Sequence, residues 1–523
     1  MQQRVDQVTV VGGGSAGWIM ALYLTTMLNR SEPGRVKVTV IESPRIPQIG
    51  VGEGTVTGFS QLLRQLDIPE KDFMLKSDAS FKCAGRFVGW QLDASGQALS
   101  QMNPFMDGGH LDGFETFHYY LKYGGDGRDY IGITQPTVDM VLAGESPKHL
   151  DAKPYDGVIP YTYHLNAAAF SEQLAAIAKQ RGVAYIQDEM LDVELAEDGS
   201  VAALQLEQAG RYPVQFVVDC TGFSGRILQQ AMGEPFLDYS KHLLVDRAIP
   251  MPVPHEDPTD IKPCTTAQAM NAGWVFNVPL FSRMGTGYIY SSAFKTDQQA
   301  TDELLQYLGD RAPKDVDPRV IPMKIGRVRN TWVKNCVAAG LSAGFVEPLE
   351  ATAIYTIERT ARHLVADFPF GGIEPVVVNK FNSVMDRQYR ESLDFIIMMY
   401  ATANRPEPFW QAARNDVELT DTLQENLALW RHQPPGPYDV SNQFLFSYWN
   451  YFFMLLGRGW FKGQDYPVRH LVRPEPWRDF LKRSAAHMPK VRAGLPSHYE
   501  YLNSLRAEPA KPKILSKYSF NYS

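Results

Sequence analysis

The chain is 523 residues long, with 44% hydrophobic and 21% charged residues, values typical of a folded globular protein of two or three modules. Its formal charge is −7 without a basic block, which argues against nucleic acid or an anionic membrane as the main partner. The four cysteines are scattered without a CxxC pair, which predicts reduced thiols, no metal site and a cytoplasmic protein. The first predicted strand starts at Val8, which leaves no room for a signal peptide, and the apolar run 395–401 is too short to cross a bilayer.

Residues 8–17, VTVVGGGSAG, begin as an apolar strand and end in a Gly-x-Gly-x-x-Gly pattern. An apolar-periodic run over 18–28 predicts the helix that follows. In this order Gly12 permits a tight turn, Gly14 lets the backbone approach a pyrophosphate, and Gly17 lets helix and strand pack closely. The stretch therefore predicts a dinucleotide site.

Two neighbouring features complete this site. The helix N-terminus, at Ser15 and Ala16, offers free N–H groups and a positive dipole end to phosphates. A second predicted strand, 36–41, is followed by Glu42, whose carboxylate can accept hydrogen bonds from ribose hydroxyls. Strand, glycines, helix, strand and acid in this order are far more specific than the glycines alone.

The glycine-punctuated loop 46–56 comes next, with Gly50, Gly52 and Gly54 beside Glu53. Such a loop suits a backbone that lies against a flat ring system, and the alternative is a mobile surface loop. Residues 80–90 alternate apolar and polar and predict a strand that carries Lys82. Considered alone, a strand lysine is usually a solvated surface charge.

The middle of the chain predicts several regular elements. Residues 163–182 predict an amphipathic helix, and 216–218 predict a strand that runs into Asp219-Cys-Thr-Gly222. An apolar strand that ends in D-x-x-G returns the chain to the cofactor in many two-dinucleotide-fold flavoproteins. The proline-dense segment 250–263 predicts a connection. The remaining predictions are strands at 184–187, 201–206 and 335–339, a GWVFNVPL block at 273–280, a hairpin at 287–292 and a helix at 351–367.

Several stretches together resemble one family, the flavin-dependent halogenases of the tryptophan halogenase type. The resemblance rests on GGGSAGW, GVGEGT, the FK of the following strand, GWxxxxP, YIYSS and FVEPLEAT. It implies an α/β fold with an FAD-binding, Rossmann-like two-dinucleotide-binding module, an added β-sheet and a mostly helical C-terminal substrate module. We expect the FAD-binding module at 1–250 and 330–370, including the inserted strands with Lys82, a sheet and linker region at 251–329 with GWVFNVP, and the helical substrate-binding module at 371–523.

The resemblance also implies an activity. Such an enzyme forms a flavin hydroperoxide from FADH2 and oxygen, and chloride or bromide then yields hypohalous acid. The acid crosses an internal tunnel to Lys82, which delivers the halogen to an electron-rich aromatic such as an indole, pyrrole or phenol. Lys82 can act by hydrogen bonding or as a haloamine, and the sequence does not separate the two. The amine must then be enclosed and joined to the flavin cavity.

The same resemblance implies partners and alternatives. FADH2 would come from a separate NAD(P)H flavin reductase, and a homodimer is left open. Two other functions are open as well: a flavin-dependent aromatic monooxygenase that hydroxylates its substrate, and a flavin-binding protein with lapsed catalysis.

Individual residues take roles by matching the family's motifs. Glu350 matches the active-site glutamate, which can stabilise a cationic arenium intermediate and remove its proton, and Glu347 is the rival. Thr352 and Ala353 match positions whose backbone amides hold halide, and an N-terminal helix turn there points free N–H groups at an anion. The residues expected to flank the flavin are Glu53, Gly54, Met190, Leu341 and Ile354.

The chain departs from the family's pattern in two motifs. W-x-W-x-I-P reads Trp274-Val-Phe276-Asn-Val-Pro279, so the aromatic pair expected to line the tunnel has a smaller second ring. P-L-E-S-T-G reads P-L-E-A-T-A, which places Ala351 where a serine is usual. In the last aromatic block, 444–460, Tyr448 and Trp449 are candidates for stacking on an aromatic substrate.

Overall fold

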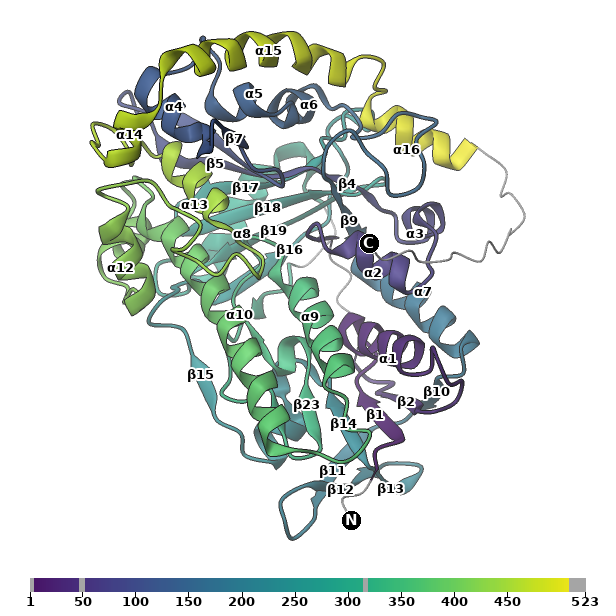
Figure 1. The fold of residues 1–523 in the computed structure, drawn as a ribbon. Helices are drawn as coiled ribbons and strands as arrows, with labels where there is room; N and C mark the ends of the chain where they lie inside the picture. Colours follow the sequence, from purple (N-terminus) through teal and green to yellow (C-terminus); the bar gives the residue numbers. More distant parts are fainter. Residues whose placement is uncertain (1–3, 47–51, 314–317, 508–523) are drawn as a thin grey trace.

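The computed structural model describes residues 4–46, 52–313 and 318–507 (Figure 1). The chain has a mixed α/β fold, in which a mostly parallel six-stranded sheet has the order β10-β2-β1-β14-β23-β22. Only the β22–β23 pair is antiparallel within it. Its strands are β1 (Gln7–Val11), β2 (Lys37–Glu42), β10 (Ala184–Gln187), β14 (Phe216–Asp219), β22 (Trp332–Val333) and β23 (Cys336–Ala338). The predicted strands at 36–41, 184–187, 216–218 and 335–339 are thus confirmed within a residue or two at each end.

The helix that follows β1 is buried on nearly every face. This helix, α1 (Ser15–Leu28), packs against α7 (Ala167–Gln180) and α9 (Thr352–Ala366) as well as against the sheet. Its even distribution of apolar residues reflects this enclosure, because a helix covered all round needs no polar face. The structure confirms the predicted helix, which begins three residues earlier than the apolar run.

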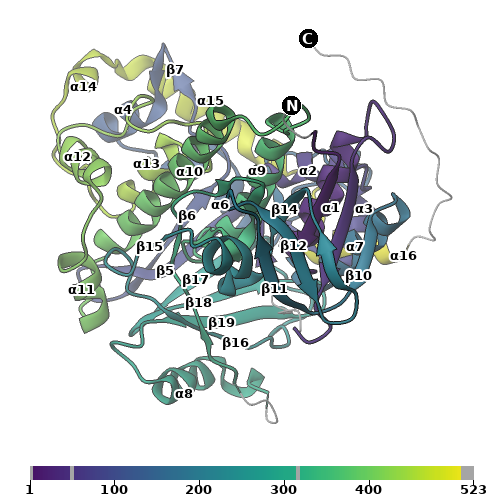
Figure 2. The same ribbon diagram turned by 90° about the horizontal axis from the view of Figure 1, so that it is seen from below.

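A seven-stranded sheet adjoins this part of the fold and has the order β20-β16-β19-β18-β17-β5-β6 (Figure 2). Its outer helix, α8 (Asp297–Leu308), packs on β19 over a separate apolar cluster. The predicted hairpin within 287–292 is wrong, since residues 287–290 continue one strand that pairs with β18, and Ser291 and Ser292 follow its end. The strands are β5 (Ala84–Leu92), β6 (Ala98–Pro104), β16 (Arg247–Pro250), β17 (Cys264–Met270), β18 (Gly273–Pro279), β19 (Met284–Tyr290) and β20 (Ile321–Pro322).

A small sheet connects the two larger ones and carries Lys82. It has the order β3-β9-β4, with β3 (Gly52–Gly54), β9 (Thr162–Asn166) and β4 (Ser80–Lys82). The single strand predicted over 80–90 is wrong, because the chain leaves this sheet at Cys83, whose N–H donates to Pro263 O at 2.8 Å. The helix predicted from 163 is wrong at its start, since Asn166 ends β9 and its side chain caps α7. Part of the predicted glycine loop, 47–51 with Gly50, lies outside the described residues.

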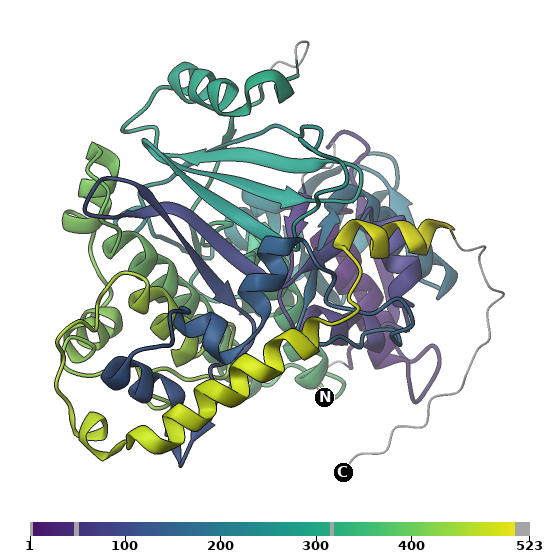
Figure 3. The ribbon, with the colours of Figure 1, turned by 90° about the horizontal axis from the view of Figure 1, so that it is seen from above.

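The C-terminal part is helical, as expected, and returns to the N-terminal half. Figure 3 shows the yellow α15 (Pro474–Arg492) alongside the dark-blue segment that contains α4 (Thr116–Tyr123) and α5 (Tyr130–Thr134). No helix in the described part of the chain is long and apolar enough to cross a bilayer. The predicted module boundaries stay a prediction, and β5, within the predicted FAD-binding module, pairs with β17 of the predicted linker region.

The other helices and strands are α2 (Phe59–Gln65), α3 (Glu70–Lys76), β7 (His110–Leu111), β8 (Phe114–Glu115), α6 (Thr137–Ala143), β11 (Met190–Leu195), β12 (Val201–Leu206), β13 (Gly210–Pro213), β15 (Phe236–Asp238), β21 (Gly326–Val328), β24 (Gly344–Phe345), α10 (Pro375–Ala401), α11 (Pro408–Asn415), α12 (Asp421–Leu429), α13 (Tyr448–Leu456), α14 (Pro467–Leu471) and α16 (His498–Ala507).

Candidate active site

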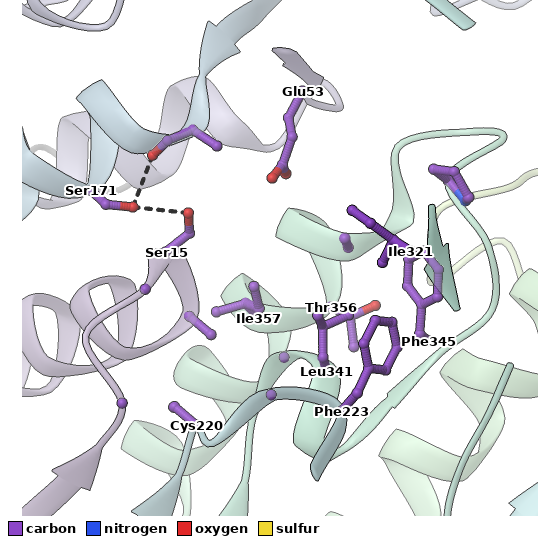
Figure 4. A pocket seen from close by; sticks show the side chains of 18 of the residues that line it. Ser15, Glu53, Ser171, Cys220, Phe223, Ile321, Leu341, Phe345, Thr356 and Ile357 are labelled. Carbon is purple, nitrogen blue, oxygen red and sulfur yellow. Dashed lines mark hydrogen bonds between the residues drawn. The ribbon is translucent and has the colours of Figure 1, made fainter. Parts of the chain in front are cut away.

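A cavity of about 470 Å³ opens at the carboxyl ends of β1, β2 and β14. In a parallel α/β sheet this edge is where ligands bind. The cavity extends from the glycine loop after β1 to Lys82 and to the start of α9. Figure 4 shows its interior, with Ser15 on one side, Leu341 and Ile357 across from it, and the Glu53 carboxyl directed inward.

The three glycines of the fingerprint have different surroundings. Gly12 has a φ of +122°, and a Cβ there would lie 2.2 Å from Cys220 O. A Cβ on Gly17 would lie 1.8 Å from Gly12 O, so this glycine permits contact between helix and strand. Gly14, in contrast, has nothing within 4 Å of an added Cβ and lines the cavity. The open space over Gly14 fits a group that approaches the backbone itself, as a dinucleotide pyrophosphate does.

The N-terminus of α1 and Glu42 lie on the same part of the cavity wall. Gly14 is the N-cap residue of α1 and supplies no side-chain cap, which leaves first-turn amides available to an anion. Ser15 and Ala16 line the cavity beside it, and the Ser15 and Ser171 hydroxyls are 2.9 Å apart. Glu42 also lines the cavity, and its Oε2 accepts a hydrogen bond from Tyr185 at 2.9 Å. The Glu42 carboxylate, the glycine turn and the start of α1 thus line the same cavity.

Lys82 is enclosed in the wall of the same cavity. It is 2% exposed, lines the cavity, and donates from Nζ to Thr55 O at 3.2 Å. A Cβ built on Gly54 would lie 3.3 Å from Lys82 Nζ, so the glycine leaves room for the amine. Burial lowers the pKa of Lys82, and the nearby Glu350 carboxylate opposes that effect. The enclosed amine thus shares one cavity with the glycine loop.

A buried relay of polar groups lies beside Lys82. Ser80 donates to the carbonyl of Pro279, which can only accept, and Ser80 Oγ is 3.0 Å from His164 Nδ1. Nδ1 therefore carries the proton, and His164 Nε2 accepts from the Thr265 hydroxyl at 2.9 Å. Burial, followed by the charge of Lys82, lowers the pKa of His164 well below its usual value. His164 is thus neutral, and Thr265 faces the cavity with its oxygen lone pairs.

Glu350 is buried beside residues of three strands: Lys82 of β4, Gly85 of β5 and Asn103 of β6. It is 5% exposed, and its Oε1 accepts from Asn103 Nδ2 at 2.7 Å. Burial raises the pKa of Glu350, while Lys82 and the Asn103 amide lower it. Glu350 does not itself line the cavity, but it is close enough to Lys82 for the charge of the amine to act on it.

The rival carboxyl, Glu347, belongs to a different hydrogen-bonded chain. Its Oε2 accepts from Tyr400 at 2.9 Å, and Tyr400 in turn accepts from Trp274 Nε1 at 2.9 Å. Burial raises the pKa of Glu347 to about 8, so the group is largely neutral at pH 7. Trp274 and Phe276 both line the cavity, with ring centroids 6.4 Å apart. Glu347 therefore fixes a wall of the cavity through Tyr400.

The start of α9 faces the cavity. Ala351, its N-cap residue, has a φ of +57°, which turns the chain sharply into the helix. Thr352 and Ala353 follow in the first turn and line the cavity, where their amides have no acceptor within the helix. Burial raises the pKa of Glu53, across the cavity, to about 7.

The other predicted residues divide into two groups. Met190, Leu341, Glu53 and Gly54 line the cavity. Among the described residues with a predicted role, those that do not line it are Glu350, as described above, Gly17, Ile354, Pro279, Tyr448 and Trp449. Ile354 is buried in the core, and Ile357, one turn later, reaches the cavity instead. Trp449 packs on Phe117 with centroids 5.1 Å apart, so it fills an aromatic core.

Sequence reasoning missed several residues around the two catalytic candidates. They are Thr55, Asn103, His164, Thr265 and Asn450. Each comes from an element whose neighbour in the site is distant along the chain, so no local pattern identifies it. The sequence offered no strand signal at His164, because a helix was predicted over 163–182, and the structure places this histidine in β9.

Comparison with known proteins identifies the family. The sequence profile of the tryptophan halogenase family matches residues 7–473. Tryptophan 7-halogenase RebH from Lentzea aerocolonigenes is 32% identical over 457 residues, which cover 82% of this chain and 83% of RebH. Tryptophan 6-halogenase SttH from Streptomyces toxytricini is 32% identical over 526 residues, covering 96% of this chain and 98% of SttH.

Solved structures agree with this result. The crystal structure of SttH matches with a TM-score of 0.89 at 33% identity and covers 95% of this chain and all of its own. BrvH, a flavin-dependent halogenase from Brevundimonas sp. BAL3, matches with a TM-score of 0.84 at 30% identity, covering 96% of this chain and 99% of its own. The fold is therefore that of the flavin-dependent halogenases, and the predicted fold class is confirmed. The chain belongs to the tryptophan halogenase family, whose members are enzymes that use FAD and halide.

Proposed function

We propose that this enzyme halogenates electron-rich aromatic compounds, such as indoles including tryptophan, pyrroles or phenols, and that Lys82 delivers the halogen. The observation that carries the proposal is the shared cavity: an amine that is 2% exposed lines the same space as the fingerprint loop. A separate NAD(P)H-dependent flavin reductase supplies reduced FAD. The relatives named above are halogenases of tryptophan, which supports an aromatic substrate.

The cavity's own residues divide the work of holding FAD. Gly12, Gly14 and Gly17 shape the turn, and the first amides of α1 hold the pyrophosphate. Glu42 accepts from the ribose. Bound FAD, once reduced, supplies with oxygen the oxidant that converts halide to hypohalous acid. Residues that enclose the ring are Glu53, Gly54, Met190 and Leu341, with Ile354 behind them.

Halide and hypohalous acid are handled by two neighbouring parts of the chain. The amides of Thr352 and Ala353 hold the halide at the start of α9. Trp274 and Phe276 exclude water from the route to Lys82. Lys82 then donates a hydrogen bond to hypohalous acid and polarises the halogen toward the substrate.

Glu350 acts on the substrate itself. Electrophilic attack on an aromatic ring generates a cation, and a carboxylate nearby stabilises that charge. The same carboxylate accepts the proton that the ring carbon must lose. Glu350 lies beside Lys82 without lining the flavin cavity, which supports a role on the substrate side of the amine.

The test is an assay with FAD, a flavin reductase, NADH, oxygen and either chloride or bromide, on a panel of indoles, pyrroles and phenols. Mass spectrometry should detect a halogen isotope pattern in at least one product. Lys82→Ala should lower the rate by at least about 100-fold, because the delivering group is gone. FAD affinity, measured by flavin fluorescence, should stay within about twofold, since the glycine loop is untouched.

Each other outcome points to a different function. Hydroxylated product that forms equally well without halide would identify a monooxygenase. FAD binding without turnover of any compound would identify a protein with lapsed catalysis. Halogenation by Lys82→Ala at the wild-type rate would contradict the role of the amine.

A further inference from the structure

A continuous chain of side-chain amides joins Glu350 to the C-terminal helices. Asn103, at the end of β6, donates from Nδ2 to Glu350 Oε1 at 2.7 Å. Its Oδ1 accepts from Asn450 Nδ2 at 2.9 Å. Asn450 lies in the first turn of α13, where its Oδ1 accepts from the N–H of Ser447 at 2.8 Å. Asn103 is 4% exposed and Glu350 5% exposed, so this end of the chain is shielded from water, whereas Asn450 is half-buried.

The direction of every bond in this chain is fixed from one end. The Ser447 N–H can only donate, so the oxygen of Asn450 must face it. Asn450 therefore presents its NH2 group to Asn103, and Asn103 must present its oxygen in return. The NH2 group of Asn103 then faces Glu350, whose Oε1 accepts from it. The helix cap and the carboxylate impose the same orientation from opposite ends.

Few other groups compete for Glu350. Lys82 of β4 is the charged side chain that acts on it, and its charge favours the ionised carboxylate. The strand β5 presents Gly85, whose added Cβ would lie 3.4 Å from Glu350 Oε2. Glu347, on the same loop, is held instead by Tyr400. The Asn103 amide is therefore the neutral group that holds this carboxylate in place.

We propose that Asn103 and Asn450 are positioning residues for Glu350, which keep it ionised and turned toward the substrate side of Lys82; this inference rests on the proposed function. One carboxylate oxygen is occupied by Asn103, and the other stays available to the aromatic ring and its proton. The C-terminal helices thereby set the basicity of a group on the loop before α9. The position of α13 and the ionisation and orientation of Glu350 are therefore linked through the side-chain amides of Asn103 and Asn450.

The first test is the pH profile of kcat/KM for halogenation. Asn103→Leu removes the donor to the carboxylate, so the acid limb should move upward by about one pH unit. Asn450→Asp keeps the volume and the bond from Ser447, but places an oxygen against Asn103. The Asn103 amide then turns over and faces Glu350 with its oxygen, and the limb should move in the same direction.

Gln101→Leu is the matched control. Gln101 lies two residues earlier on β6, and its Nε2 donates to Met454 O of α13 at 3.3 Å. The variant loses a contact between the same two elements without touching Glu350. The acid limb of its pH profile should stay where the wild type has it. A shift as large as that of Asn103→Leu would show that any loosening of α13 moves the limb, and would overturn the inference. If Asn103→Leu fails to fold, the isosteric Asn450→Asp decides alone, and an unshifted limb in it overturns the inference.

The second test does not depend on catalysis. Asn103→Leu, Glu350→Gln and the double variant form a cycle of thermal midpoints at pH 5 and pH 8. The coupling should be larger at pH 8 than at pH 5, because a higher pH favours the ionised carboxylate, and equal coupling at both values contradicts the inference. If the wild type halogenates no compound while the cycle behaves as expected, the proposed function fails and the positioning chain stands. If the wild type halogenates but neither the profile nor the cycle responds, the positioning chain alone fails.

Discussion

Glu347 should make the free energy of unfolding depend on pH, and a single substitution tests this. Its pKa in the folded protein is about 8, against an ordinary value of 4.5, because the carboxyl is buried. Above pH 4.5 the unfolded chain is ionised here, so folding takes up a proton, and this uptake costs more as the pH rises. From pH 4.5 to 8 this group should lower the free energy of unfolding by up to about 1.4 kcal/mol per pH unit.

Glu347→Gln should remove that part of the pH dependence, because the amide does not titrate. Denaturant unfolding between pH 5 and 9 should show the variant gaining on the wild type as the pH rises. A constant difference across this range would mean that Glu347 is ionised in the folded protein. Tyr400→Phe is a useful companion, since it leaves Glu347 and Trp274 each short of a buried partner, at a cost of about 2 kcal/mol or more.

Ala351 is a second residue with a direct test. Its φ of +57° is left-handed, which costs a residue with a Cβ about 1–2 kcal/mol relative to glycine. Ala351→Gly relieves this cost but adds about 0.5–1 kcal/mol of chain entropy in the unfolded state. The net effect should be a gain of up to about 1.5 kcal/mol in unfolding free energy. Ala353→Gly, inside α9, should lose stability instead, and a loss in both variants would contradict the strain.

At the scale of elements, two glycines of the strand–turn–helix formed by β1 and α1 have different roles: Gly14 serves FAD binding, and Gly17 serves the packing of the helix. A Cβ on Gly14 meets nothing within 4 Å, but projects into the cavity. Gly14→Ala should therefore fold like the wild type and bind FAD at least about tenfold more weakly, since its methyl group occupies the place of a phosphate. Gly17→Ala should instead lower the unfolding free energy, because its Cβ would lie 1.8 Å from Gly12 O.

Flavin fluorescence titration and thermal unfolding of both glycine variants distinguish the two roles. Equal loss of FAD affinity in the two, with no difference in thermal midpoint, would contradict the assignment of Gly14 to the ligand. The pair is matched, since both changes add one methyl group to the same turn and helix.

The elements that could be predicted are those whose cause is local. The order of strand, glycines, helix and acid up to Glu42 follows from neighbouring residues, and the structure reproduces it. The break at Cys83 could not be predicted, because a carbonyl of Pro263 causes it. The strand at 162–166 was hidden for the same reason, since its partners β3 and β4 lie elsewhere in the chain.

The residues of the site show the same contrast between features with a local sequence signal and features that depend on contacts distant in the chain. Lys82 and Glu350 were singled out by resemblance to a family, and by pattern alone each would have been an ordinary charge. Their partners, among them Asn103 and His164, are polar residues whose roles depend on contacts between distant strands. Tyr448 and Trp449 stay predicted substrate contacts; both are buried among aromatic rings, and their neighbour Asn450 donates to Asn103.

At the scale of the whole molecule, the C-terminal helix α16 supports the strand that carries Lys82. His498 is fully buried, and its Nε2 accepts from the N–H of Phe81 at 3.0 Å, across 417 residues of chain. Its Nδ1 lies 2.8 Å from Ile261 O, to which it donates. One neutral imidazole thus holds the residue before Lys82 and the connection that leads to β17.

This arrangement gives a prediction for acid stability. Burial lowers the pKa of His498 to about 4, from an ordinary value of 6.5. Below pH 6.5 the unfolded chain is protonated here, so folding must release a proton, and this release costs more as the pH falls. The group should therefore remove up to about 1.4 kcal/mol of unfolding free energy per pH unit from pH 6.5 down to 4. His498→Gln does not titrate and should lack this loss.

His498→Gln should also be less stable than the wild type at pH 8, by about 1–3 kcal/mol, because a single amide cannot serve both Phe81 and Ile261 in the same geometry. Halogenation should fall with it, since the support for Lys82 is weakened, while FAD affinity stays unchanged. Glu500→Gln, in the same helix and bonded to Ser497, is the control and should leave the acid limb of stability as it is. If His498→Gln loses stability on acidification from pH 6.5 to 4 as steeply as the wild type does, another group titrates in this range, and α16 does not carry the acid sensitivity of the fold.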